Sequence, residues 1–127
     1  KKRQTSAEIL QAVTKHFNTE ETGYAHFYLA YELKRVGEVN LAIESFQSAL
    51  PTIPREKKVQ AYEQLAILYE HKLKDYEQAM AFSEKGLELL QQIPFQKETQ
   101  LLTKQMKWQK RLGRLDNKIN KNNSNKR

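Results

Sequence analysis

The sequence predicts an all-α protein built from antiparallel helix-turn-helix repeats, with capping helices at both ends. Long stretches of Ala, Leu, Glu, Lys and Gln, which are strong helix formers, separate only three prolines and four glycines. No stretch alternates apolar and polar residues as a half-buried strand would. A two-helix pattern also occurs twice, at a period in the mid-thirties. Together these observations favour a helical repeat over any sheet-containing fold.

The first two helices are predicted from their capping residues. Thr5 and Glu8 can form a capping box that starts a helix ending near Asn18. A second helix follows and runs to about Val36, where Gly37 provides a left-handed cap. Short joints between such helices predict antiparallel neighbours.

Prolines and helix formers predict the remaining helices. We expect a helix over 39–50, which the prolines that follow it interrupt, and another over 54–72. A further helix is expected over 76–92, and Pro94 opens the last and longest one. The chain is therefore expected to comprise an N-terminal capping helix (1–22), two helical hairpins (23–93), a long basic C-terminal helix (94–116) and an Asn/Lys-rich, flexible tail (117–127).

The internal repeat is the most specific feature of the chain. Residues 25–30 recur as 61–66, and residues 38–42 recur as 75–79, at separations of 36 and 37 residues. In both copies, small residues stand where two helices can approach closely, and large residues fill the space beside them. The repeat positions are His26, Leu29, Ala30, Leu33, Ala42, Phe46, Ala49 and Pro54, then Tyr62, Leu65, Ala66, Tyr69, Ala79, Ser83, Gly86 and Pro94.

This pattern resembles the tetratricopeptide repeat (TPR). The resemblance implies a solenoid of two stacked hairpins that works as a scaffold for protein–protein interaction. More narrowly, residues 33–37, 68–76 and 110–115 are similar to the C-terminal helical repeats of bacterial ribonuclease-H-like exonuclease-type proteins. That likeness implies either the accessory region of a nuclease or a stand-alone bacterial relative. The chain begins without Met, so we expect either a piece of a longer protein or a trimmed chain.

The net charge of +7 is concentrated at the two ends of the chain. Residues 97–127 contain ten basic and two acidic side chains, residues 1–3 add three positive charges, and residues 4–96 carry a net charge of −4. A basic terminal helix is either a solvated surface or a contact for nucleic-acid phosphates. The candidate phosphate contacts are Lys104, Lys107, Lys110, Arg111, Arg114 and Lys118.

No pattern typical of an active site is present. The chain has no cysteine, and His16, His26 and His71 lack the spacing of metal ligands. We expect His26 to pack in the core and His71 to bond the carbonyls at a helix end. No Gly-rich phosphate loop or catalytic triad is evident, so we expect no enzyme, no cofactor and no metal. Without a signal peptide or a long apolar run, a cytoplasmic location and no membrane partner are expected.

Two surfaces are candidates for binding a partner. In stacked hairpins the first helix of each pair lines a groove, here through Tyr24, Phe27, Tyr31, Lys34, Gln60, Glu63, Ile67 and Glu70. The aromatic residues of 24–31 could hold an apolar peptide or helix, or they could be buried by Ile9, Val13 and Phe17 of the first helix.

The second surface is a heptad seam on the last helix. It could cap the repeats, pair with a partner's helix or form a homodimer. The seam consists of Leu101, Trp108, Leu112, Leu115 and Ile119. We therefore expect a non-catalytic interaction module that binds a peptide or helix of a protein partner. The alternative is a nucleic-acid-associated accessory region of a nuclease, which would use the basic C-terminal helix.

Overall fold

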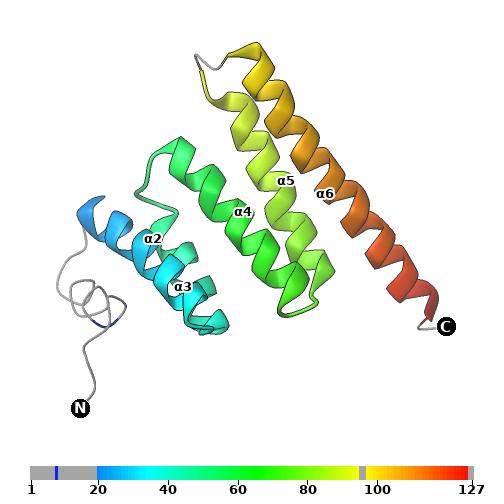
Figure 1. Ribbon diagram of the computed structural model, residues 1–127, viewed down its shortest axis with the longest axis horizontal. Coiled ribbons are helices and arrows are strands. Elements are labelled where there is room, and N and C mark those ends of the chain that lie inside the picture. Colours follow the sequence, from blue (N-terminus) through cyan, green and yellow to red (C-terminus); the bar gives the residue numbers. More distant parts are fainter. Residues whose placement is uncertain (1–7, 9–19, 95–96, 126–127) are drawn as a thin grey trace. The chain divides into compact units, whose positions relative to one another are not determined.

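The computed structural model describes Glu8, residues 20–94 and residues 97–125. The chain forms two compact units, Lys1–Pro54 and Arg55–Arg127. All elements in the described part of the chain are α-helices, as Figure 1 shows, so the all-α class is confirmed. The expected helix over 5–18 lies outside the described residues, apart from Glu8. None of the described helices combines the length and the apolarity that crossing a membrane requires.

The first unit contains a hairpin of α2 (Glu20–Arg35) and α3 (Val39–Ala49). Its core is aromatic, because Phe27 of α2 meets Phe46 of α3 edge-to-face at 6.1 Å between ring centroids. The small repeat residues Ala30, Ala42 and Ala49 are fully buried. The small repeat residues of this hairpin therefore lie in its core.

Gly37 makes the turn between α2 and α3, as expected. Its φ of +88° lies in the left-handed region that favours glycine. The Gly37 amide donates to the Lys34 carbonyl, and the Glu38 amide donates to the Leu33 carbonyl at 2.8 Å. This is the Schellman pattern that closes a helix on a left-handed residue.

The second unit contains α4 (Arg55–His71), α5 (Tyr76–Gln92) and α6 (Glu98–Asn125). Consecutive helices run in opposite directions, so α4 and α6 run in the same direction (Figure 1). The small residues Ala66, Ala79 and Gly86 are again buried. Asp75 begins α5 by accepting a hydrogen bond from the Gln78 amide at 3.2 Å, which satisfies a free amide of the first turn.

The ends of α2 to α5 lie within about two residues of the expected positions, but the last helix differs. It begins at Glu98 and continues to Asn125, across most of the segment expected to be a flexible tail. The reason lies in its contacts. Leu115 is fully buried, and the ammonium of Lys118 lies 5.2 Å from the centre of the Tyr76 ring. Composition alone indicated an Asn-rich tail, whereas these contacts hold the helix in place beyond residue 116.

Candidate functional site

The aromatic residues of α2 do not share one environment. Phe27 is 1% exposed and Tyr31 is half-buried, since their rings pack edge-to-face at 5.1 Å and both reach Phe46. Tyr24 is 37% exposed. Phe27 is therefore a core residue rather than a groove residue. The helix opposite it is α3, and the alternative of burial by residues 9–17 falls outside the described part.

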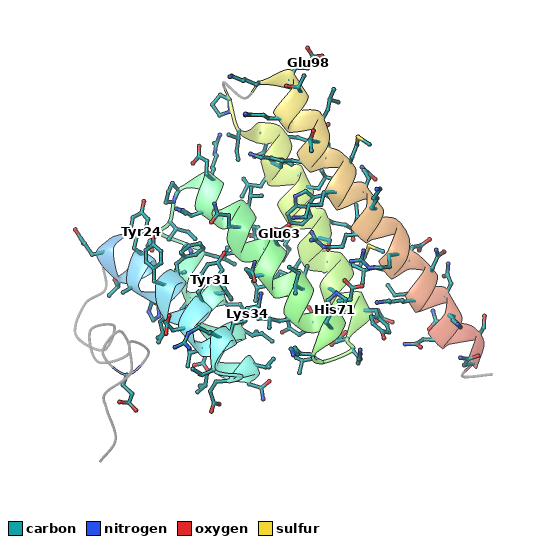
Figure 2. The ribbon with its side chains drawn as sticks, in the orientation of Figure 1. Tyr24, Tyr31, Lys34, Glu63, His71 and Glu98 are labelled. Carbon is teal, nitrogen blue, oxygen red and sulfur yellow. The ribbon has the colours of Figure 1, made fainter. Side chains whose placement is uncertain are left out.

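Lys34 of α2 and the candidates on α4 also differ in exposure. Lys34 and Ile67 are half-buried, and Gln60 is exposed. Figure 2 labels Tyr24, Tyr31 and Lys34 on α2, and Glu63 and His71 on α4. The α2 residues belong to the first unit and the α4 residues to the second. The candidate site considered below lies within the second unit.

Glu70 was expected in the groove but is fully buried, and its carboxylate has cationic partners. Arg114 donates to both of its oxygens, from Nε at 2.7 Å and from Nη2 at 2.8 Å. Lys118 Nζ donates to Oε2 at 2.7 Å, and His71 Nε2 lies 3.5 Å from Oε1. These hydrogen bonds join α4 to α6, so the Glu70 carboxylate has a structural role.

These contacts determine the pKa of Glu70. The hydrogen bond from Arg114 lowers the pKa of Glu70 to about 2, outweighing the opposing effect of burial. The hydrogen bond from Lys118 and the charges of Arg114 and His71 act in the same direction. The pKa of Arg114 is raised in turn, chiefly by its hydrogen bond to Glu70. His71 thus lies against a carboxylate, where helix-end carbonyls had been expected.

A second acidic residue of α4 repeats the arrangement one heptad earlier. Glu63 Oε2 lies 3.2 Å from Arg111 Nη2 and 3.4 Å from Lys107 Nζ. The guanidinium of Arg111 also lies 4.8 Å from the centre of the Trp108 ring. We call these contacts the charge ladder. Each of its rungs is one α4 glutamate with two α6 cations four residues apart: Glu63 with Lys107 and Arg111, and Glu70 with Arg114 and Lys118.

The sequence carried a signal for the ladder that was missed. Glu63 and Glu70 are seven residues apart, and so are the corresponding cations of the two rungs. Because α4 and α6 run in the same direction, equal spacings keep the two helices in register (Figure 1). Matching the acidic heptad of one helix to the basic heptad of another would have predicted the contact.

The ladder includes several of the expected phosphate contacts. Four of the six candidate cations, Lys107, Arg111, Arg114 and Lys118, are engaged by Glu63 or Glu70. Arg111 is also only 5% exposed. Lys104, Lys107, Lys110 and Arg114 are exposed. Part of the positive charge of α6 is therefore paired with the acidic face of α4, and the exposed cations remain open to an external anion.

The heptad seam of α6 is also used within the unit. Trp108 and Leu115 are buried, while Leu101, Leu112 and Ile119 are partly buried. Trp108 packs with Leu87 and Leu90 of α5, and its ring lies directly over Gly86, where an added Cβ would overlap it. The seam residues up to Leu115 therefore pack in the core of the second unit.

A cavity of about 450 Å³ lies between α4 and the first half of α6. Its apolar lining comes from Val59, Leu90, Ile93 and Trp108, with Pro94 at the end of α5. The polar lining comes from two helices: Glu56, Gln60 and Glu63 on α4, and Gln100, Lys104 and Lys107 on α6. Five sequence-predicted site residues meet here: Gln60, Glu63, Lys104, Lys107 and Trp108.

The described residues hold no group of three or more His, Cys, Asp or Glu side chains that could bind a metal ion. His26 is half-buried, and burial lowers its pKa. The cavity offers an apolar surface with charged side chains at its rim. Comparison of the chain with protein-family models, with curated proteins and with solved structures finds no match.

Proposed function

We propose that this chain is a non-catalytic protein–protein interaction module that binds a peptide segment of a partner in the cavity between α4 and α6. The observation that carries the proposal is the joint lining of that cavity. Buried or partly buried apolar residues, Trp108 among them, lie between two polar walls of different helices. An apolar centre with a polar rim is the usual composition of a recognition site.

The hairpins support a TPR-like scaffold for this role. Buried small residues recur at corresponding positions of α2–α3 and α4–α5, namely Ala30, Ala42 and Ala49, and Ala66, Ala79 and Gly86. In such a scaffold, the first helix of each pair lines the binding surface. Here α4 is a first helix, and α6, which runs in the same direction, takes the next such place. The nucleic-acid alternative has less support, because Glu63 and Glu70 engage most of the α6 cations.

A blocked-cavity variant tests the proposal. Gln60 is exposed and lines the cavity, so Gln60→Phe should fill the entrance without disturbing buried residues. Gln47→Phe is the matched control, because Gln47 is exposed on α3 in the other unit. We expect peptides selected from a random display library on the wild-type chain to bind Gln47→Phe equally and Gln60→Phe at least tenfold more weakly. Equal binding to all three proteins would refute the proposed site.

A further inference from the structure

We infer that the cavity is an unfilled rung of the charge ladder, and that its occupant is a peptide with a large apolar side chain between a cationic and an anionic one. The cationic side chain would face Glu56 and the anionic one Lys104. This inference rests on the proposed function and specifies the partner's chemistry. It follows from the register of the ladder, the composition of the cavity and the charges that the structure leaves unpaired.

The ladder register extends one heptad before Glu63. Seven residues earlier on α4 stands Glu56, and seven residues before Lys107 and Arg111 on α6 stand Gln100 and Lys104. The same spacing therefore places Glu56 opposite Gln100 and Lys104. All three residues line the cavity. The cavity thus occupies the position at which the next ion pair between α4 and α6 would form.

This rung is open, in contrast to the two that follow. Glu63 and Glu70 each contact their α6 cations at 2.7–3.4 Å. Glu56 and Lys104 are both exposed, and neither makes an ion pair with another residue in the described part of the chain. The open rung therefore presents one free negative and one free positive charge on opposite walls.

The two walls specify a bipolar occupant. A uniformly acidic peptide would meet Lys104 favourably but would be repelled by Glu56, and a uniformly basic peptide would meet the reverse. Glu63 adds little net negative charge to the cavity, because it forms ion pairs with Arg111 and Lys107. Only a segment carrying both signs, placed on the matching sides, completes the rung.

The floor of the cavity specifies the central side chain. Trp108 is almost fully buried, and Val59 and Ile93 are partly exposed beside it. A volume of about 450 Å³ is at the small end of ligand pockets and suits one large side chain with its backbone. An aromatic or branched aliphatic residue would bury the exposed edges of this floor.

Charge reversal tests the inference. The probe is the tightest peptide selected on the wild-type chain from a random display library, with its affinity measured by fluorescence anisotropy. We expect this peptide to carry both charges around an apolar residue. Glu56→Lys and Lys104→Glu should each weaken its binding about tenfold, since an attraction is replaced by a repulsion. Reversing the matching charge of the peptide should restore most of that loss. Glu44→Lys, on an exposed position of α3, is the control and should change nothing.

The outcomes separate this inference from the proposed function. If Gln60→Phe abolishes binding but both charge reversals leave the affinity within twofold, the cavity binds a peptide and the bipolar rung is wrong. If the selected peptides carry one sign of charge only, the rung is likewise wrong. If Gln60→Phe leaves the affinity unchanged, the proposed site itself fails. Circular dichroism of each variant establishes that the helices are retained.

Discussion

At the scale of single residues, Glu70 is the most informative side chain of the described structure. It is a buried carboxylate that receives two hydrogen bonds from Arg114 and one from Lys118. Burial of an ion is costly, and here the cost is offset by a bidentate guanidinium and an ammonium. Removing one member of such a group leaves the others charged and without a counterion, so the loss exceeds the value of one surface pair.

We therefore expect Glu70→Ala to lower the free energy of unfolding by about 3–5 kcal/mol. Glu32→Ala is the matched control, because Glu32 pairs with Arg35 at 2.8 Å on the surface of α2. An exposed pair of this kind contributes about 0.2–1 kcal/mol. Urea unfolding followed by circular dichroism measures both losses. Comparable losses for the two variants would contradict the structural role of Glu70.

The depressed pKa of Glu70 also predicts how stability depends on pH. The group holds its charge down to pH of about 2 when folded, but takes up a proton near pH 4.5 when unfolded. Its contribution is therefore complete above pH 4.5 and is lost as pH falls towards 2. A shift of this size corresponds to about 3 kcal/mol at neutral pH.

The measurement is the difference in unfolding free energy between wild type and Glu70→Gln at several pH values. We expect the difference to shrink as the pH falls from about 4.5 to 2. A difference that stays constant through that interval would mean that Glu70 titrates normally in the folded protein.

At the scale of helices, α6 is held by apolar packing on α5 and by the charge ladder on α4. The two helices α5 and α6 approach closely at Gly86, where a Cβ atom would overlap the Trp108 ring. Glycine lowers helix stability by about 1 kcal/mol relative to alanine, so its presence inside α5 indicates a packing requirement. Gly86 leaves the space that the large ring of Trp108 needs.

Two identical substitutions separate packing from helix propensity. Gly86→Ala should destabilise the protein by about 1–3 kcal/mol, because the overlap outweighs the gain in propensity. Gly113→Ala in α6 should instead stabilise it by about 0.5–1 kcal/mol, since nothing lies within 4 Å of the added Cβ. Thermal and urea unfolding give both changes. Stabilisation by Gly86→Ala would contradict the close approach of α6.

Most helices could be predicted from the sequence because the residues that begin or end a helix act on their near neighbours. Gly37 closes α2 and Asp75 lies directly before α5, so each end depends on a few neighbouring residues. The burial of Phe27 and Glu70 could not be read in the same way, because it depends on which helix lies opposite. The same reason explains the end of α6. Its Asn-rich composition predicts a tail, whereas Lys118 and Leu115 contact distant residues.

The candidate site was predictable in part for a similar reason. Gln60 and Glu63 followed from the expected groove, and Lys104, Lys107 and Trp108 from the C-terminal helix, but the signal that joins the two groups was missed. What joins them is the shared direction of α4 and α6, together with matching heptads of opposite charge. Such a match between two helices is visible only when their charge patterns are compared with each other.

At the scale of the whole molecule, the charge distribution acquires a structural explanation. Residues 4–96 are acidic on balance, and residues 97–127 are strongly basic. Within the second unit, the acidic face of α4 and the basic face of α6 meet in the charge ladder. The net charge of +7 therefore combines an acidic and a basic region, and the two regions form ion pairs with each other in the second unit. The cavity lies where this pairing stops, which is why we place the partner there.

Trp108 allows the central claim to be measured directly. It is the only tryptophan of the chain, and it lines the proposed binding cavity. The measurement is a titration of the wild-type chain with a selected, tryptophan-free peptide, followed by intrinsic fluorescence. We predict a saturable change in Trp108 emission that is retained in Gln47→Phe and lost in Gln60→Phe. Saturable binding of that peptide without any change in Trp108 emission would contradict the account.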